Sequence, residues 1–553
     1  MLGYDPALAA VLAAAAPAEG SAHGLEPAVA AVLLVAAGIC LAGLLSHRTG
    51  IPSPVLLVLG GLLASPLVGT GFALEPEVVL VLVLPPLLYS AALDASLLDF
   101  RANTRAIGLL SVALVMVSAF AVGGVAHLVV PDLPWAAALA LGAVLAPPDA
   151  VAAISIGRRF GMPSRLQTLI EGEGLLNDAT ALVLYSVAVS AAVGGGFSYG
   201  RAGGQLLLAA VGGLLIGLAV AWVVGQVRRR LEEPLVENAL SLATPFLAYL
   251  PAEQVHASGV LAVVVCGLVL GHSSTTLLSS TSRLQTQPVW RLVVFLLEGG
   301  VFLLIGLQLP QILAGLEGYS GLQVLGWSTA VVLATMLVRP LWIWPATYLP
   351  RLLSARVRAA DPSPPWQQVL ALSWAGMRGV VSLAAAVALP LTTEDGRPFP
   401  QRDLLLFLVF VVILTTLLLQ GLTYGHVLRA LGLRPDRQGV LLAQAAAQQS
   451  AARVAVQRLD EAVGDDPHAA EVAEQLRLLT RTRADARWER LAEVRGEHGE
   501  TPSATWRRLR GVMLEAERAE LLRLRDEGRL PDEAMREMQR TLDLEEAVVI
   551  RAD

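Results

Sequence analysis

The chain has 553 residues, of which 55% are hydrophobic and only 16% are charged, and its mean hydropathy is +0.62. Soluble proteins carry charge on about a quarter of their residues, so this composition excludes a string of soluble domains and predicts a polytopic membrane protein. The net charge is −6, from 46 acidic residues and 40 basic residues that are all arginine. We expect no nucleic acid partner and no cofactor.

The first segment, residues 1–26, is predicted to be an external leader. Its alanine-rich stretch from Ala7 to Ala18 resembles the apolar part of a secretory signal. No basic residue precedes that stretch, whereas Asp5 does, so a cleaved signal is the weaker alternative.

Apolar segments of about 20 residues predict membrane-spanning helices, because that length crosses the hydrocarbon core of a bilayer. The chain contains thirteen such segments, which together predict an all-α transmembrane domain over residues 27–430. Their centres lie near Val35, Leu62, Leu84, Val117, Leu141, Ala181, Gly217, Ala243, Val263, Phe302, Val332, Val381 and Ile413.

Arginine is concentrated in every second predicted loop. Loops after odd-numbered helices carry 14 arginines and loops after even-numbered helices carry 3, with Arg339 left out because it lies near a predicted helix end. The positive-inside rule then places the N-terminus outside the cell and the C-terminal tail in the cytoplasm.

The last segment, residues 436–553, is rich in alanine, arginine and glutamate and is predicted to form a helical cytoplasmic tail. Helix start signals occur at Asp466-Pro467, at Thr501-Pro502 and at Pro531. The simpler interpretation is a solvated bundle that shields the protein or pairs with a second copy. The more specific interpretation is a regulatory domain.

Six charged residues lie within the apolar segments, where an ionisable side chain is costly unless it is paired or hydrated. They are therefore candidates for a functional site. They are Asp149, Glu171, Glu173, Asp178, Glu298 and Arg378.

Pro147 and Pro148 precede Asp149 in the fifth predicted helix and remove two backbone donors from its middle. Gly376 and Gly379 flank Arg378 in the twelfth helix and permit a similar interruption there. One broken helix in each half of the bundle indicates a transport site built on inverted repeats. Taken alone, Pro147-Pro148 is equally compatible with a simple kink.

Asn177 and Asp178 lie midway along the sixth helix, with Gly174 one turn before Asp178 and leaving room for an ion. A carboxylate buried in apolar surroundings binds a proton more readily than it does in water. Such a group holds either a proton or a bare monovalent cation, and this competition is an exchange mechanism. Asp178 and Asp149 are the expected Na⁺ ligands, with the Asn177 amide oxygen and freed carbonyls. A polar pair that only bonds to a neighbouring helix is the alternative.

Arg378 needs a counter-ion when it is buried, and Glu173 or Glu171 is the expected partner. That pairing would leave Asp178 free to bind and release a proton. Glu298 is interpreted either as a second interior charge or as a residue on the access path.

Four stretches resemble the monovalent cation:proton antiporter-1 family, which contains the bacterial NhaP and eukaryotic NHE exchangers. They lie on the third, fifth, sixth and twelfth predicted helices, and the resemblance spans residues 27–430. The stretches are Leu84–Tyr89, Ala146–Ala152, Glu171–Asp178 and Gly376–Leu383, the last of which includes Ser382.

The resemblance implies that Asp178 carries the cation and the proton, with Asn177 as a helix-stabilising neighbour and Asp149 as a second polar group. It also implies a Glu173–Arg378 ion pair and electroneutral exchange. An inverted-repeat fold, a homodimer, an elevator-like motion and a place in the bacterial cytoplasmic (inner) membrane follow from the same resemblance.

The chain departs from the family pattern at three positions. Many relatives have Thr-Asp-Pro where this chain has Pro148-Asp149-Ala150, a serine is common where Gly174 stands, and some carry an acid near Ser90. The missing oxygens leave the preference among Na⁺, K⁺ and Li⁺ open, so a K⁺/H⁺ antiporter is the nearest alternative. An intramembrane aspartic protease using Asp149 and Asp178 is a remote one.

Overall fold

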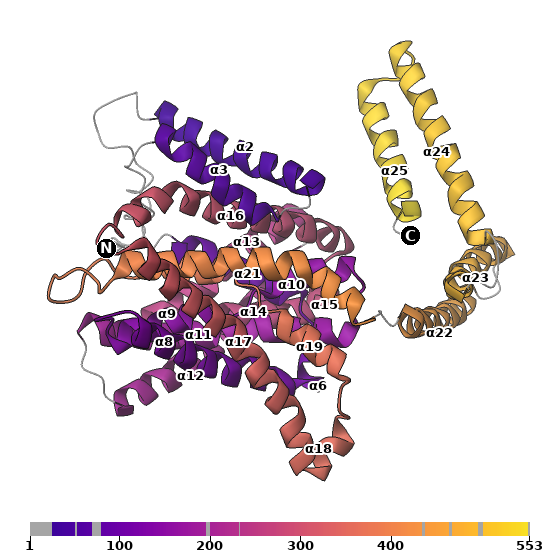
Figure 1. Ribbon diagram of the computed structural model, residues 1–553. Coiled ribbons are helices and arrows are strands. Elements are labelled where there is room, and N and C mark those ends of the chain that lie inside the picture. The colour runs from indigo at the N-terminus through magenta and orange to yellow at the C-terminus, as the bar shows by residue number, and fades with distance from the viewer. Residues whose placement is uncertain are drawn as a thin grey trace, which may run out of the picture. The chain divides into compact units, whose positions relative to one another are not determined.

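The computed structural model describes residues 25–49, 52–68, 79–194, 199–231, 233–433, 437–463, 467–495 and 501–550 (Figure 1). The predicted external leader lies almost entirely outside these residues. Within them the structure is helical and contains no β-strand apart from an isolated bridge between Thr392 and Pro398. The chain divides into two compact units, Met1–Arg434 and Pro435–Asp553, which are described separately below.

The first unit contains helices α2 to α21, with two π-helical stretches named η1 and η2. In its first half these are α2 (Leu25–Thr49), α3 (Ser53–Val68), η1 (Val79–Val83), α5 (Leu84–Asp94), α6 (Leu97–Ala102), α7 (Thr104–Gly108), η2 (Leu109–Leu114), α8 (Val115–Val129), α9 (Trp135–Leu145), α10 (Ala150–Arg159) and α11 (Ser164–Val193). In its second half they are α12 (Tyr199–Arg228), α13 (Pro234–Gln254), α14 (Gly259–His272), α15 (Ser274–Leu277), α16 (Ser280–Ala314), α17 (Gly321–Leu353), α18 (Ala355–Ala360), α19 (Trp366–Trp374), α20 (Val380–Val387) and α21 (Arg402–Ala430).

Seven segments among the described residues are long and apolar enough to cross a membrane, and four shorter helices are also apolar. Each of the thirteen predicted centres falls inside a described helix. The prediction of an all-α polytopic membrane protein is confirmed, whereas the number of thirteen crossings stays a prediction.

Two helices are interrupted in the middle of the unit. The segment 146–149, which contains Pro147 and Pro148, separates α9 from α10, and the segment 375–379 separates α19 from α20. The two segments touch, because the backbone N–H of Asp149 donates a hydrogen bond of 2.6 Å to the carbonyl of Met377. Four helix ends therefore lie close to one another inside the protein.

The helices of this unit pack around two apolar cores. One core involves α8, α9, α20 and α21, and the other involves α5, α12, α13 and α14. Helix α11 contributes to both, with Leu166 and Ile170 in the first core and Leu175 and Ala179 in the second. The middle of α11 is thus held on two sides.

Close backbone approach contributes to this packing, as it does in membrane helix pairs generally. Gly123 of α8 faces α9 so closely that a Cβ there would lie 2.8 Å from the carbonyl oxygen of Ala138. Gly61 of α3 would in the same way meet the backbone of Gly306 in α16. Substitution of these glycines therefore requires the helices to move apart.

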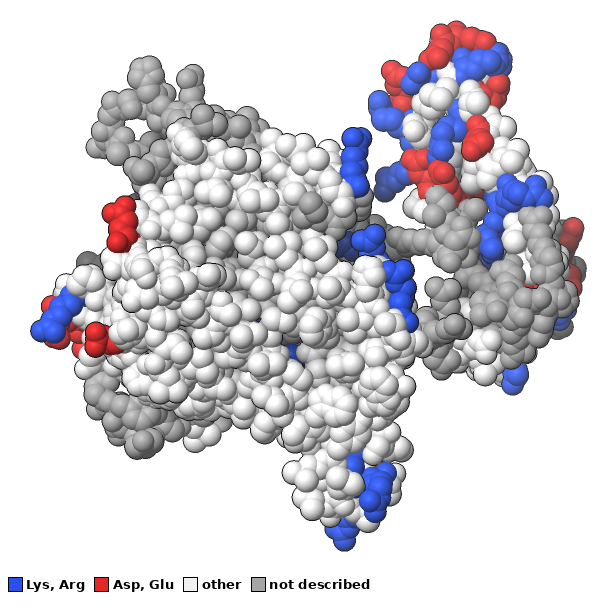
Figure 2. All heavy atoms as spheres, viewed as in Figure 1, with Lys and Arg blue, Asp and Glu red and all other residues white. Residues whose placement is uncertain are grey.

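The surface of the first unit is apolar over most of the face seen in Figure 2, and charged side chains lie near its two ends. Leu63, Leu128 and Leu322 expose 78%, 83% and 80% of their surface. Large apolar side chains at this exposure are unfavourable in water and favourable in lipid. The surface therefore fits a protein surrounded by a bilayer.

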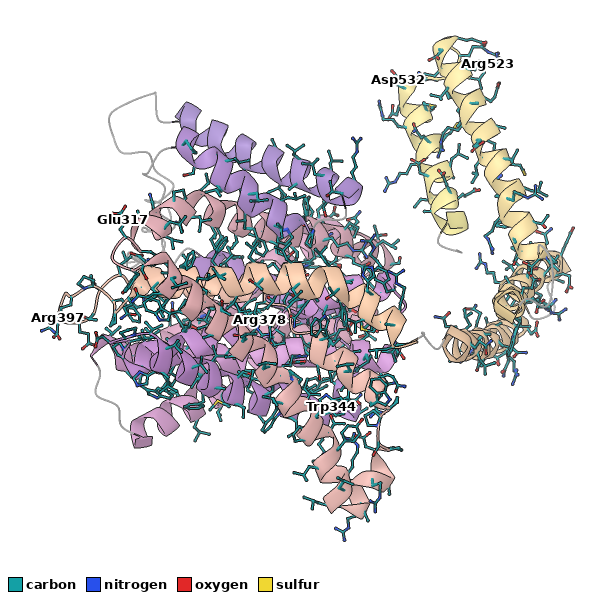
Figure 3. The ribbon with its side chains drawn as sticks, viewed as in Figure 1. Glu317, Trp344, Arg378, Arg397, Arg523 and Asp532 are labelled. Carbon is teal, nitrogen blue, oxygen red and sulfur yellow. The ribbon has the colours of Figure 1, made fainter. Side chains whose placement is uncertain are left out.

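The second unit consists of α22 (Arg437–Val463), α23 (Pro467–Arg495), α24 (Pro502–Asp526) and α25 (Asp532–Ile550). The last three begin within a residue of the predicted start signals, which confirms the helical tail. Helices α24 and α25 share a small core of Leu514, Leu521, Met535 and Leu542. Between them Arg518 pairs with Asp543 and Glu546, each at 2.7 Å. Figure 3 labels Arg523 and Asp532 near the turn that joins the two helices.

Candidate functional site

A cavity of about 500 Å³ lies beside the two helix interruptions. It gathers acidic residues from α5, from the N-cap of α10, and from α11 and α16 around the unwound backbone. The sequence-predicted residues that line it are Pro147, Pro148, Asp149, Glu171, Gly174, Asp178, Glu298 and Ser382. Asn177, Glu173 and Arg378 lie behind this surface and are buried.

Asp149 lies at the start of α10 and acts as its N-cap. Its Oδ1 accepts hydrogen bonds from the backbone N–H groups of Val151 at 2.9 Å and Ala152 at 3.2 Å. Its Oδ2 lies against Gly379 at the start of α20, so closely that a Cβ on Gly379 would collide with it. Helix N-termini carry a partial positive charge. The negative charge of Asp149 is therefore balanced by the ends of two half-helices.

Asp178 lies on α11, and no backbone N–H groups of a described helix N-terminus bind its carboxylate as they bind that of Asp149. Asp178 is buried, and its carboxylate receives no hydrogen bond or ion pair from any residue that the structure describes. A buried acid without donors is stabilised in its charged form only by an ion or water and is otherwise more stable when protonated. Of the two acids at the helix interruptions, Asp178 is therefore the one whose carboxylate has no donor among the described residues.

Asn177 connects α11 to the first interruption. Its Nδ2 donates a hydrogen bond of 3.0 Å to the carbonyl of Pro148, and its Oδ1 accepts one of 2.6 Å from the backbone N–H of Asp178. The oxygen that was considered as a cation ligand is thus already engaged. This geometry fits a residue that positions Asp178 beside the unwound segment.

Gly174 lines the cavity, but the space beside its Cα is used differently from the prediction. A Cβ at this position would collide with the Cβ of Ala150 at the start of α10. The glycine therefore allows α10 and α11 to approach each other, and the room that it provides is filled by Ala150 rather than by an ion.

Arg378 lies in the interior of the helical bundle, as Figure 3 shows, and binds backbone carbonyls. Its Nε donates to the carbonyl of Leu145 at 2.8 Å and its Nη2 to that of Ala146 at 3.4 Å, while Nη1 donates to Gly376. The last carbonyls of a helix have no partner within the helix and carry a partial negative charge. Arg378 therefore caps the broken end of α9.

The partner of Glu173 differs from the prediction. Glu173 forms a two-pronged ion pair with Arg339 of α17, with distances of 2.5 and 2.8 Å, and both side chains are buried. The predicted Glu173–Arg378 pair is therefore wrong, because the donors of Arg378 are used by carbonyls. Arg339 also donates from Nε to the carbonyl of Leu372 near the end of α19, at 3.1 Å. Arg378 thus binds the end of α9, and Arg339 binds the backbone near the end of α19. These two helices are the first halves of the two interrupted helices.

Sequence reasoning missed Arg339, although the same signal was present. It is an arginine within a long apolar run, and the rule that selected Arg378 selects it as well. It was left out because it lies near a predicted helix end, but α17 continues past it to Leu353.

Three of the predicted site residues, Glu171, Glu298 and Ser382, lie at the edge of the site. Glu171 is partly exposed and pairs with Arg158 at 3.2 Å and with the side-chain amide of Gln167 at 2.7 Å, so it is not the partner of Arg378 either. Glu298 enters the cavity from α16, and Ser382 enters it from the first turn of α20. Neither has a hydrogen bond from its side chain to another described residue.

The site can thus offer carboxylate oxygens, the hydroxyls of Ser90, Ser155 and Ser382, and unwound backbone around a space large enough for water and ions. Oxygen ligands of this kind suit hard cations that exchange part of their hydration shell.

Comparison with known proteins agrees with this geometry. The family described as "Sodium/hydrogen exchanger, transmembrane" matches residues 32–430. An uncharacterised Na⁺/H⁺ exchanger of Mycobacterium tuberculosis is 35% identical over 96% of this chain and 97% of its own length. A sodium, potassium, lithium and rubidium/H⁺ antiporter of Bacillus subtilis is 33% identical over 67% of this chain and 56% of its own length.

Among solved structures, the sodium proton antiporter MjNhaP1 of Methanocaldococcus jannaschii matches with a TM-score of 0.59 and 20% identity. The match covers 73% of this chain and all of that one, and at this identity it shows the fold alone. Proteins of this family are transporters of monovalent cations and protons and not enzymes, which excludes the aspartic protease interpretation. The chain belongs to the transmembrane sodium/hydrogen exchanger family.

Proposed function

We propose that the protein exchanges Na⁺ for H⁺ across the bacterial cytoplasmic membrane, with Asp178 as the carboxylate that both ions share. The observation that carries this proposal is the contrast between the two acids at the interruptions. Asp149 is capped by backbone N–H groups, whereas the carboxylate of Asp178 faces the cavity without a donor among the described residues.

Sharing one carboxylate couples the two ions. A proton on Asp178 removes the charge that attracts Na⁺, and bound Na⁺ disfavours protonation by the same Coulomb interaction. Because one negative charge is neutralised by one ion of either kind, the proposed exchange is one cation for one proton and electroneutral. Asp149 contributes an oxygen and keeps its charge throughout the cycle.

The cation is proposed to reach the site from alternate sides of the membrane. Two interrupted helices that touch at Asp149 and Met377 support an inverted-repeat arrangement in which a core bundle moves past a scaffold. The position of α11 between two apolar cores is compatible with such a motion. A homodimer, thirteen membrane crossings, an external N-terminus and a cytoplasmic tail complete the proposal, the orientation resting on the arginine distribution.

K⁺ is the second candidate cation. The B. subtilis relative is named as a sodium, potassium, lithium and rubidium/H⁺ antiporter. In the present chain the positions of Gly174 and Ala150 bring no side-chain oxygen to the cavity. A ligand shell with fewer fixed oxygens leaves more of the cation's coordination to water and discriminates less by ion size.

The first prediction concerns Asp178. In everted membrane vesicles with a preformed pH gradient, added Na⁺ should dissipate the gradient through the wild-type protein. Asp178→Asn should abolish this response, because an amide neither binds a proton in this range nor attracts Na⁺ by charge. The measurement is the recovery of a fluorescent pH probe after Na⁺ or K⁺ is added.

Asp132→Asn is the matched control, because it makes the same chemical change on an exposed turn with a left-handed backbone that asparagine also adopts. It should respond like the wild type. Normal exchange by Asp178→Asn at equal protein amounts would contradict the assignment.

A further inference from the structure

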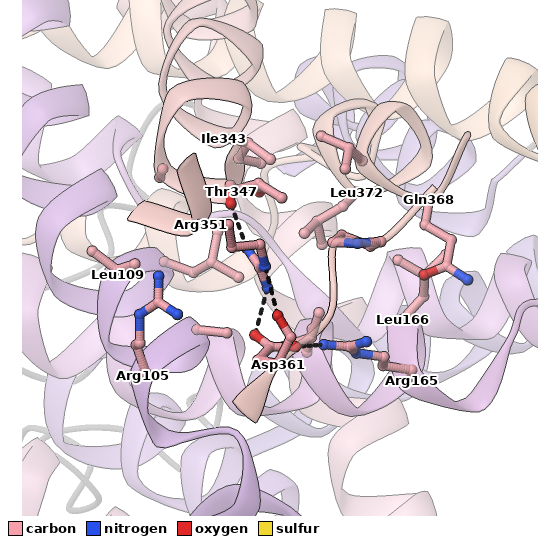
Figure 4. Close-up of a pocket in the computed structure, with 16 residues that line it drawn as sticks. Arg105, Leu109, Arg165, Leu166, Ile343, Thr347, Arg351, Asp361, Gln368 and Leu372 are labelled. Atoms are coloured by element: carbon pink, nitrogen blue, oxygen red, sulfur yellow. Dashed lines mark hydrogen bonds and ion pairs between the residues drawn. The ribbon is translucent and has the colours of Figure 1, made fainter. Parts of the chain in front are cut away.

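A second cavity lies at one end of the first unit, where the starts of α7 and α11 meet the end of α17 (Figure 4). Its volume is about 60 Å³, and none of its lining residues also lines the exchange cavity. Three arginines reach it from these three helix ends. It is therefore a separate feature of the same bundle.

The charges in this cavity do not balance. Asp361 pairs with Arg165 at 2.5 Å and also with Arg351, whose Nε donates to the Asp361 carbonyl at 3.1 Å. Arg105 lines the same cavity and has no ion pair or side-chain hydrogen bond with a described residue. Figure 4 shows its guanidinium directed toward the space beside Arg351. Three positive charges and one negative charge leave a net charge of about +2, which favours an anion.

Apart from Thr347 and Gln368, the remaining wall of the cavity is apolar. Leu109, Leu166, Ile343 and Leu372 form much of it. A free inorganic anion gains nothing from such a wall, whereas a phospholipid carries an anionic phosphate next to acyl chains. The space accommodates a phosphate group, and the chains would continue along the apolar side chains.

The location also favours a lipid. The arginine-rich helix ends are those that the positive-inside rule places at the cytoplasmic interface, where anionic headgroups of the inner leaflet lie. We propose that this cavity binds the phosphate of an anionic phospholipid through Arg105 and Arg165, with an acyl chain against the leucine-lined wall. Bound there, the lipid joins α7, α11 and α17, two of which carry Asp178 and Arg339 of the exchange site.

The test uses the purified full-length protein after delipidation in mild detergent. Phosphatidylglycerol should raise its melting temperature by several degrees, because a ligand that binds only the folded state stabilises it. Phosphatidylcholine should not do so. In Arg105→Gln the phosphatidylglycerol concentration that gives half of the shift should rise about tenfold, which is about 1.4 kcal/mol of binding.

Arg105 is chosen because its replacement breaks no ion pair with a described residue, so the variant should fold. Arg356→Gln is the matched control, because Arg356 is an exposed arginine of α18 that does not line the cavity. It should keep the wild-type response. Arg105→Gln should also retain less phosphatidylglycerol than Arg356→Gln in native mass spectrometry.

Three results would overturn the proposal. The first is an equal shift with phosphatidylcholine, and the second is an unchanged phosphatidylglycerol response in Arg105→Gln. The third is a shift of the same size with inorganic phosphate or glycerol 3-phosphate that disappears in Arg105→Gln, which would assign the site to a soluble phosphate. All of these readouts are independent of which cation the protein exchanges.

Discussion

Asp149 and Asp178 show how one cavity gives two carboxylates different tasks. Backbone N–H groups at the start of α10 hold Asp149, and Asn177 holds the helix segment around Asp178 while leaving its carboxylate unbound. The difference arises from where each residue lies relative to a helix N-terminus. Chemical identity alone does not distinguish them.

Two substitutions of Asp149 separate the effect of its charge on Na⁺ binding from its effect on stability as a helix cap. Asparagine caps helices about as well as aspartate, so Asp149→Asn should fold normally. It should raise the apparent KM for Na⁺ about tenfold, or about 1.4 kcal/mol, because the cation loses a charged oxygen. Asp149→Ala should lose the cap as well, at a cost of about 1 kcal/mol in stability. Transport assays in proteoliposomes and thermal unfolding measure the two effects.

An unchanged KM in Asp149→Asn would show that Asp149 is only a cap. A strong loss of stability in that variant, equal to the loss in Asp149→Ala, would show that its charge is needed for folding.

At the scale of the helices, two arginines support the interruptions. Arg378 binds the end of α9, and Arg339 joins the end of α19 to Glu173 on α11. A buried ion pair contributes little against an apolar replacement, but removing one partner leaves an uncompensated charge at a cost of about 3 to 5 kcal/mol. The Glu173–Arg339 pair is therefore expected to fix the register between helices.

A double-mutant cycle tests this pairing. Glu173→Gln and Arg339→Gln should each lower the yield and thermal stability strongly, and the double variant should recover part of the loss. The expected coupling is about 1 to 3 kcal/mol. The same cycle with Arg378→Gln in place of Arg339→Gln is the control and should show weaker coupling. Stronger coupling between Glu173 and Arg378 than between Glu173 and Arg339 would contradict the structure.

Pro147-Pro148 and the glycines around Arg378 are local sequence signals, and each lies in a segment that separates two helices in the structure. The sequence also selects the buried acids Glu173 and Asp178, because charge within an apolar run is conspicuous, but the buried Glu237 of α13 was missed. The sequence could not show which arginine faces Glu173. That choice depends on the packing of α11 against α17 and on carbonyls freed at the end of α9, and neither has a signature in the order of residues.

At the scale of the whole molecule, the chain combines an apolar transmembrane unit with a charged helical tail that has its own small core. Composition predicted this division, because the tail carries about half of all charges in under a quarter of the length. The role of the tail is not encoded in such a pattern, since mixed charges on helix faces serve solubility in most proteins.

Removal of residues 435–553 should therefore leave exchange by the transmembrane unit within about twofold of the full chain, because the two units have separate cores. The comparison is made at equal protein amounts in proteoliposomes and over a range of pH. A shift of the pH profile after removal would instead identify the tail as a regulatory domain.

Proton release from the purified protein shows whether Na⁺ and H⁺ share Asp178. Na⁺ is added in weakly buffered detergent solution, and released protons are measured alongside bound Na⁺ by calorimetry. We expect about one proton to be released per bound Na⁺ for the wild type and for Asp132→Asn, and neither Na⁺ binding nor proton release for Asp178→Asn. Na⁺ binding without proton release in the wild type, or release that persists in Asp178→Asn, would contradict this expectation.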